Sequence, residues 1–155
     1  MARFASVSRH ANKGKGTETQ VQNALDTWQR VEPLTREYNR LLDSKAARRI
    51  VKTAPADFDY YADGTFGLIE AKETEHSFRL PKARVTQFAS MLKRHYAGGV
   101  CAIVVYHSKD KVYRGVPMDF LVLGADKPSW DLTPIPAVPT ASEALCHIWE
   151  GFACP

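Results

Sequence analysis

The sequence lacks long apolar segments, internal repeats and glycine-rich phosphate loops. Its longer apolar runs, such as Val100–Tyr106, are far shorter than the roughly 20 apolar residues that a membrane-spanning helix needs. The basic N-terminus has no apolar core of the kind that secretory signals carry. No loop of Walker type is present, so nothing in the sequence indicates a nucleoside triphosphatase. We therefore expect a protein without a membrane segment.

Cysteine is also scarce, and its placement excludes a cysteine-based metal site. The chain has three cysteines, Cys101, Cys146 and Cys154, and no two of them stand at metal-ligand spacing. An odd number of cysteines without a paired framework favours reduced thiols in a cytoplasmic protein. Cys101 lies inside an apolar strand pattern and is expected to be buried.

The length and charge of the chain indicate one domain with an anionic partner. A chain of 155 residues fits a single domain with one sizeable core. The formal net charge of +4 favours a partner such as nucleic acid. Residues 1–16 are polar and basic and form either an arm that neutralises phosphates or a solubilising terminus. Residues 127–139 contain four prolines and are expected to run over the surface without regular structure.

The stretch Pro55–Lys72 predicts a β-hairpin. Asp63 and Gly64 stand between aromatic and β-branched residues, and this pair favours a two-residue turn because both positions tolerate positive φ. With that loop, Ala62 faces Thr65, and the register of every other pair follows.

The predicted register places two acidic residues opposite each other. Asp57 faces Glu70, and Lys72 shares the face of Glu70 because side chains alternate along a strand. Opposed like charges are destabilising, and a divalent cation such as Mg²⁺ or Mn²⁺ can offset the repulsion. The alternative is a set of ordinary solvated charges at strand ends. Asp59 lies on the same face but opposes Leu68, so it is the weaker candidate.

A helix is predicted to begin at Thr17, which forms a capping box with Gln20. Glu18 lies on the same side of this helix as its apolar positions. It is either a first-turn acid that complements the helix dipole or a third carboxylate directed at the hairpin. The apolar positions are Val21, Leu25 and Trp28.

The second half of the chain predicts an α/β fold. Pro81 suits the first position of a helix that runs to about Tyr96 and stops at Gly98. Val100–Tyr106 is a continuous apolar run, as expected of a strand covered on both faces, and a strand, a helix and a strand in this order suggest a βαβ crossover on a mixed sheet. The apolar stripe of the helix comprises Val85, Phe88, Leu92 and Tyr96, with Gln87 off it. Val112–Val116 reads as a strand, Met118–Leu123 as a strand or short helix, and Thr140 or Ser142 as the cap of a last helix.

These residues together resemble the PD-(D/E)xK nuclease superfamily. Asp57 stands near the family's P-D, displaced by one residue, and Glu70-x-Lys72 supplies the E-x-K. The string Glu70-Ala71-Lys72-Glu73-Thr74 is more similar to the E-A-K-E-T of RecU-type Holliday junction resolvases, and the thirteen-residue step from Asp57 to Glu70 matches their spacing. Gln87 falls near the glutamine of their next helix. An archaeal-type resolvase has a similar core, and a phage-encoded member is compatible with this length.

The resemblance implies a restriction-endonuclease-like core in a homodimeric, Mg²⁺-dependent endonuclease that cleaves four-way DNA junctions, in the cytoplasm of a bacterial cell or phage-infected host. It implies that Asp57 and Glu70 hold the cation and that Glu18 joins them directly or through water. Lys72 would position the attacking water or stabilise charge at phosphorus, and Gln87 would orient Lys72 or touch the DNA backbone. Another nuclease of the superfamily, or a non-catalytic DNA-binding relative, remains an alternative.

Junction recognition rests on branch shape and phosphate placement, so basic side chains are the expected DNA contacts. For each of them the alternative is a solvated surface charge. The candidates are Lys13, Lys15, Lys45, Arg48, Arg49, Arg79, Lys82 and Arg84.

Overall fold

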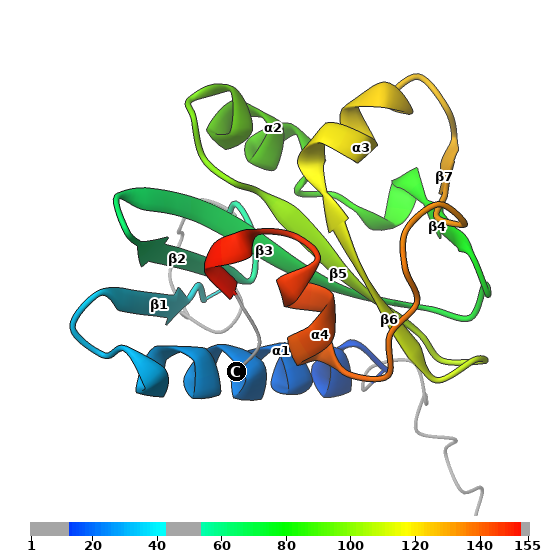
Figure 1. Cartoon of the computed structure of the whole chain (residues 1–155). Helices are drawn as coiled ribbons and strands as arrows, with labels where there is room; N and C mark the ends of the chain where they lie inside the picture. The colour runs from blue at the N-terminus through cyan, green and yellow to red at the C-terminus, as the bar shows by residue number, and fades with distance from the viewer. Residues whose placement is uncertain (1–12, 43–53, 153–155) are drawn as a thin grey trace, which may run out of the picture.

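The computed structural model describes residues 13–42 and 54–152. Residues 13 and 14 are described by their backbone only. A five-stranded mixed sheet forms the centre of the described chain, and helices cover both of its faces (Figure 1). The elements in order are α1 (Lys13–Val31), β1 (Arg36–Arg40), β2 (Phe58–Ala62), β3 (Thr65–Thr74), β4 (Arg79–Pro81), η1 (Lys82–Arg84), α2 (Phe88–Tyr96), β5 (Ala102–His107), β6 (Val112–Pro117), α3 (Met118–Leu123), β7 (Ser129–Asp131), α4 (Ala141–Cys146) and η2 (Glu150–Phe152).

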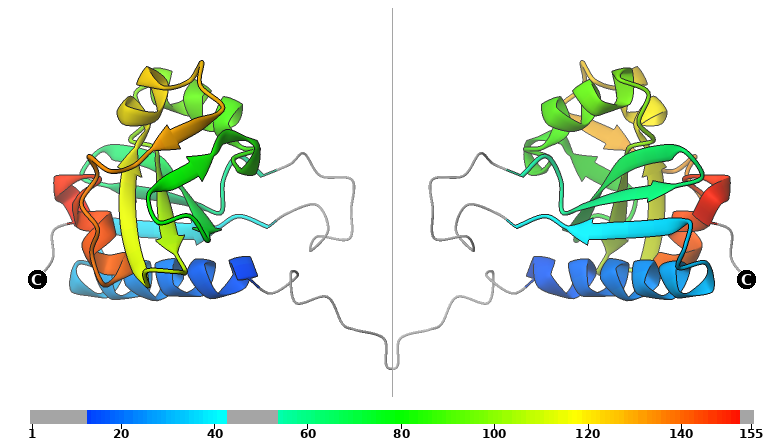
Figure 2. Two further views of the ribbon diagram at one scale, coloured as in Figure 1. Left: turned by 90° about the vertical axis from the view of Figure 1, so that its right-hand side faces the viewer. Right: turned by 90° about the vertical axis from the view of Figure 1, so that its left-hand side faces the viewer.

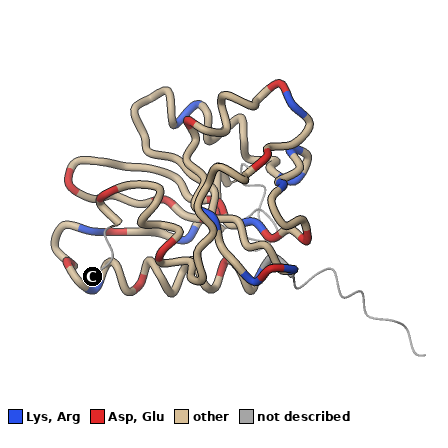
Figure 3. Tube along the Cα trace, turned by 45° about the vertical axis from the view of Figure 1, so that its right-hand side comes forward, with Lys and Arg blue, Asp and Glu red and all other residues tan. Residues whose placement is uncertain are grey.

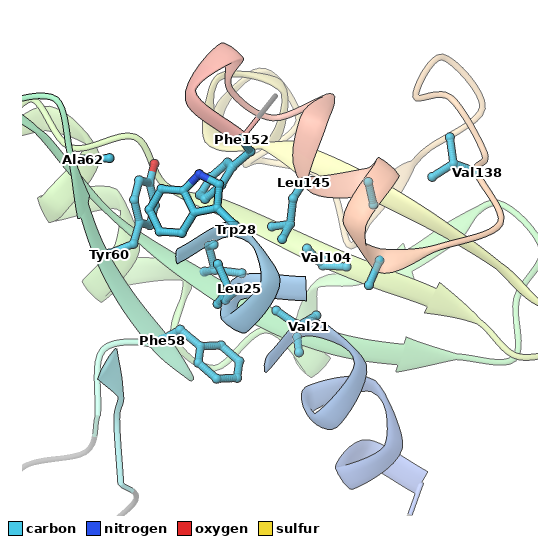
Figure 4. Close-up of a cluster of buried hydrophobic side chains, with 14 residues drawn as sticks. Val21, Leu25, Trp28, Phe58, Tyr60, Ala62, Val104, Val138, Leu145 and Phe152 are labelled. Atoms are coloured by element: carbon cyan, nitrogen blue, oxygen red, sulfur yellow. The ribbon is translucent and has the colours of Figure 1, made fainter. Parts of the chain in front are cut away.

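The strand order β1-β2-β3-β5-β6 confirms the predicted α/β fold class, a mixed central sheet flanked by helices. β3 and β5 are parallel and are joined through α2, which is the expected βαβ crossover, whereas the other neighbours are antiparallel. α1 and α2 lie on opposite sides of the sheet (Figure 2). One apolar cluster packs the sheet against α1 and α4 (Figure 4), and a second packs it against α2, α3, β4 and β7.

The hairpin has the predicted register. Asp63 and Gly64 have φ of 50° and 75°, the positive values that a two-residue turn of this kind requires. Ala62 pairs with Thr65, and the pairing continues to Phe58 opposite Ile69. The short-range turn signal was therefore sufficient to predict which residues of β2 and β3 oppose each other.

Helix α1 differs from the prediction at its start. It begins at Lys13, one turn before the predicted capping box, and Thr17 is 2% exposed inside the helix instead of capping it. Helical chain thus replaces the last four residues of the expected basic arm, and residues 1–12 lie outside the described part. The apolar stripe is confirmed, because Val21, Leu25 and Trp28 are all buried in the cluster shown in Figure 4.

Helix α2 begins later than Pro81. The chain first makes the short 3₁₀ turn η1 and reaches α2 only at Phe88. Val85 is buried, and Phe88 and Leu92 pack against the second apolar cluster, as predicted. Tyr96, by contrast, is 71% exposed, and Met91, which the predicted stripe does not include, is fully buried. Gly98, with φ of 93°, follows the helix end as expected.

The proline-rich segment 127–139 is not simply surface chain. Ser129–Asp131 forms β7, which pairs with β4, and Trp130 and Leu132 are 2% and 0% exposed. The two large apolar side chains favour burial, and the prolines flank the three-residue strand without interrupting it. Thr140 caps α4 as predicted, because its side-chain oxygen accepts a hydrogen bond from the Glu143 N–H at 3.2 Å.

Two expectations from composition have different outcomes. Cys101 is buried and free, as predicted. Cys146 is disulfide-bonded, which contradicts the expectation of reduced thiols throughout. No helix in the described ranges is long and apolar enough to cross a membrane.

His107 makes the fold sensitive to acid. Its ring is fully buried at the end of β5, and Nδ1 lies 2.5 Å from the His76 carbonyl oxygen. Burial lowers the pKa of His107 below its ordinary 6.5, and the Arg114 charge acts in the same direction. The unfolded chain therefore binds this proton more readily, so stability falls as pH drops below about 6.5.

We expect His107→Asn to remove this part of the acid sensitivity. Asparagine keeps one N–H donor but does not titrate. Urea unfolding at pH 5.5 and pH 8 should show a larger loss for the wild-type protein than for the variant. An equal loss in both would show that His107 does not contribute.

Candidate active site

The centre of the candidate site lies on the α2 side of the sheet. Leu68 belongs to the apolar cluster under α2, whereas Ile69 and Ala71 belong to the cluster under α1. Because side chains alternate along β3, Glu70 and Lys72 face the α2 side with Leu68. The predicted shared face of the glutamate and the lysine is therefore present.

Asp57 is tied to the same strand. It immediately precedes β2, and its Oδ2 accepts a hydrogen bond from the Ala71 backbone N–H at 2.8 Å. Its own backbone carbonyl accepts from the Leu41 N–H, also at 2.8 Å. Contacts to β3 and to the residue after β1 thus fix Asp57 beside Glu70, close enough for the two carboxylates to affect each other's titration.

Glu70 is a fully buried carboxylate, with 0% of its surface exposed. It forms an ion pair with the Lys72 ammonium, but neither of its oxygens takes part in a hydrogen bond of normal geometry. Burial and then the Asp57 charge raise the pKa of Glu70 to about 7, against the opposing effect of Lys72. A fully buried acid whose Oε1 contacts an ammonium and whose Oε2 lacks a hydrogen-bond partner is a poor structural element and a suitable ligand for a cation.

The pKa of Asp57 is also raised. Burial is the main cause, the Ala71 N–H opposes it, and the negative charge of Glu18 adds to it. Lys72 is therefore the cation that acts on both carboxylates, and its single positive charge does not offset the effects that raise both pKa values.

Lys72 has a second partner on the opposite element. Its Nζ lies 3.5 Å from Oε1 of Gln87, the residue that immediately precedes α2. The side chain of Lys72 is 20% exposed, and its ammonium lies between the buried carboxylate of Glu70 and the amide oxygen of Gln87. The structure thus brings Asp57, Glu70, Lys72 and Gln87 together, and the roles predicted for them stay predictions.

Glu18 is near this group but does not join it. Its Oε2 lies 2.7 Å from Nη2 of Arg40, the last residue of β1. Among the residues that the structure describes, no three His, Cys, Asp or Glu side chains gather closely enough to hold an ion. The predicted three-carboxylate set is therefore absent in this arrangement, although Glu18 still acts on Asp57 electrostatically.

Arg40 is a candidate residue that the sequence analysis missed. It is adjacent to Leu41, whose N–H binds the Asp57 carbonyl, and its side chain holds Glu18. The basic residues selected from the sequence pass directly from Lys15 to Lys45 and omit Arg40. Recognising β1 as a partner of β2 would have placed Arg40 opposite Phe58, beside the site.

The candidate DNA contacts have different surroundings. Lys15, Arg79 and Arg84 are exposed, and Arg84 lies in η1 just before Gln87. Lys82 is already bound within the protein, since its ammonium contacts the Ala125 carbonyl and lies over the Phe88 ring, which argues against a DNA contact. Basic and acidic positions alternate along the trace in Figure 3. The candidates Lys45, Arg48 and Arg49 lie outside the described residues, as does the side chain of Lys13.

The donor set suits a hard divalent cation. Asp57 and Glu70 offer carboxylate oxygens, and both oxygens of Glu70 lack regular hydrogen bonds although they are buried. Mg²⁺ is commonly held by one or two carboxylates, with water and substrate oxygens completing its shell. Two carboxylates beside a lysine therefore fit Mg²⁺ or Mn²⁺.

Comparisons with known proteins find likeness to solved structures. No protein-family model matches the sequence, and no curated protein matches it. Among solved structures, the chain is similar to Hjc, a Holliday junction resolvase from the archaeal hyperthermophile Archaeoglobus fulgidus. The TM-score is 0.47 at 17% sequence identity, over 83% of this chain and 99% of that chain.

Proposed function

We propose that this protein is a metal-dependent DNA endonuclease that cleaves four-way junctions. The single observation that supports the chemistry most is the fully buried Glu70 with half-buried Asp57 beside it and Lys72 on the same face of β3. Folding gains nothing from an acid pair that lacks sufficient positive charge, whereas phosphodiester hydrolysis by a bound cation needs such a pair.

Each residue has a role in this proposal. Asp57 and Glu70 would hold Mg²⁺, which supplies Lewis acidity toward a scissile phosphate oxygen. Lys72 carries a positive charge close to that phosphate and either positions a water molecule or stabilises charge that develops at phosphorus. Gln87, whose Oε1 lies 3.5 Å from the Lys72 Nζ, would orient that ammonium toward the substrate.

The choice of a four-way junction as substrate depends on the sequence. The E-A-K-E-T string at Glu70–Thr74 and the aligned Asp57 resemble RecU-type resolvases, and the net charge of +4 suits an anionic partner. Symmetric resolution of a junction needs two active sites, so the proposal includes a homodimer.

Cleavage of a synthetic four-way junction in Mg²⁺ tests this proposal. We expect paired symmetric nicks from the wild-type protein and none from Glu70→Gln. The matched control is Asp59→Asn, which changes a carboxylate on the same face that bonds to Asn39 at 3.0 Å, outside the acid pair. Its cleavage rate should stay within about twofold of wild type, as for a surface substitution.

The same assay separates the alternatives. Equal cleavage of linear duplex and junction would indicate a nuclease of another specificity. Tight junction binding without cleavage in either Mg²⁺ or Mn²⁺ would indicate a DNA-binding relative. Cleavage that persists in Glu70→Gln would reject the site itself.

A further inference from the structure

The side-chain oxygen of Gln87 is held from two sides. Oγ1 of Thr86, the preceding residue, donates to Gln87 Oε1 at 2.9 Å, and Nζ of Lys72 approaches the same oxygen at 3.5 Å. One contact comes from the loop before α2 and the other from β3. The Gln87 amide oxygen therefore contacts both the loop before α2 and strand β3.

Gln87 does not serve its own helix with this side chain. It occupies the N-terminal capping position of α2, but its side chain makes no capping hydrogen bond. Its backbone carbonyl accepts from the Met91 N–H at 3.0 Å, as in any first helical turn. The side chain is thus available to the site, and Thr86 and Lys72 determine how it is oriented.

An amide group has one acceptor oxygen with two lone pairs and one nitrogen with two donor hydrogens. In Gln87 both contacts fall on the oxygen, and the amide nitrogen has no hydrogen-bond partner among the described residues. A flipped amide would place its N–H groups against the Lys72 ammonium and against a hydroxyl. The flip would therefore turn an attractive contact with Lys72 into a repulsive one.

We infer that Thr86 is a positioning residue that fixes the Gln87 amide with its oxygen on Lys72 and its N–H groups toward the substrate side. A phosphate oxygen of bound DNA can then accept those N–H groups while Lys72 remains beside Glu70. The two contacts to Gln87 Oε1 support the orientation of the amide without any assumption about function. The expected effect on kcat rests on the proposed nuclease function.

Side-chain NMR tests the orientation without any reaction. The Gln87 amide resonances are assigned by their absence in Gln87→Glu, and their ¹⁵N order parameter is measured in three proteins. We expect a fixed amide in the wild-type protein and in Thr86→Ser, which keeps the hydroxyl. In Thr86→Val, which has the same shape without the hydroxyl, the order parameter should fall below about 0.6.

Junction cleavage tests the consequence. We expect Thr86→Val to lower kcat about fivefold, the rate equivalent of one ordinary hydrogen bond, with KM within twofold. Thr86→Ser should restore kcat. Thr27→Val is the matched control, because it removes an exposed hydroxyl that bonds only to its own helix at the Asn23 carbonyl, 3.0 Å away.

The outcomes separate this inference from the proposed function. If the wild-type protein cuts no DNA, the proposed function fails, while the order of the Gln87 amide still decides the role of Thr86. An equally ordered amide in Thr86→Val and the wild-type protein would overturn the inference. So would an amide in Thr86→Ser as mobile as in Thr86→Val, because the hydroxyl would then not be responsible.

Discussion

A Glu70→Gln variant is expected to lose junction cleavage by on the order of 10³-fold, the scale seen when one electrostatic group of an active site is removed. Glutamine has nearly the same shape, so the change removes a negative charge and leaves the packing of β3 in place. The loss should appear in kcat, because Arg84 and the other exposed cations that would bind DNA are untouched.

The same variant is expected to be more stable than the wild-type protein at alkaline pH. The folded-state pKa of Glu70, about 7, lies above its ordinary 4.5, so the folded protein binds this proton more tightly than the unfolded chain. The stabilisation from this group is complete below about 4.5 and is lost as pH rises through about 7. Removing the carboxylate should thus stabilise the fold by up to about 3 kcal/mol at pH 8, because the raised pKa already includes the attraction to Lys72.

Thermal unfolding at pH 5 and pH 8 in metal-free buffer measures this difference. The gain of Glu70→Gln over wild type should be clear at pH 8 and small at pH 5. Addition of Mg²⁺ should raise the melting temperature of the wild-type protein more than that of the variant, because ligand binding stabilises only a fold that binds it. A variant that is less stable than wild type at pH 8 would contradict the view that this carboxylate is costly.

A Trp130→Ala variant is expected to lose about 3–5 kcal/mol of unfolding free energy, as is usual for a large buried aromatic residue. The Trp130 ring is 2% exposed and lies 5.4 Å from that of Phe88, centroid to centroid. Its Nε1 donates to the Leu121 carbonyl at 2.8 Å, so the substitution also leaves a buried acceptor without its partner.

Urea unfolding compares this variant with Tyr96→Ala, an aromatic truncation on α2 where the side chain is 71% exposed. The control should change stability by less than about 0.5 kcal/mol. A similar small loss for Trp130→Ala would mean that residues 127–139 are surface chain after all.

The parts of the fold that the sequence predicts correctly are those with local signals. The Asp63-Gly64 turn determines which residues of β2 and β3 oppose each other, and alternation along β3 places Glu70 and Lys72 on one face. The apolar run after Gly99 likewise predicts β5, because a strand covered on both faces needs no alternation.

The parts that the sequence does not predict depend on contacts between distant segments. Strand β7 forms because it pairs with β4. Residues 127–139 contain four prolines, and nothing in this segment indicates that β4 is its partner. Arg40 reaches the site only through the pairing of β1 with β2. The hydrogen bond from Thr86 to Gln87 lies directly after the 3₁₀ turn η1. The sequence predicts one continuous helix from Pro81 and gives no sign of this turn.

The pairing of β4 with β7 has a consequence for the newly made chain. Arg79 pairs with Asp131, 52 positions later, and the Lys82 N–H binds the Pro128 carbonyl, so the segment that leads to Gln87 is anchored by residues synthesised much later. During translation the acid pair and its lysine emerge well before this anchor. The arrangement around Gln87 is therefore expected to be completed only after β7 has been synthesised.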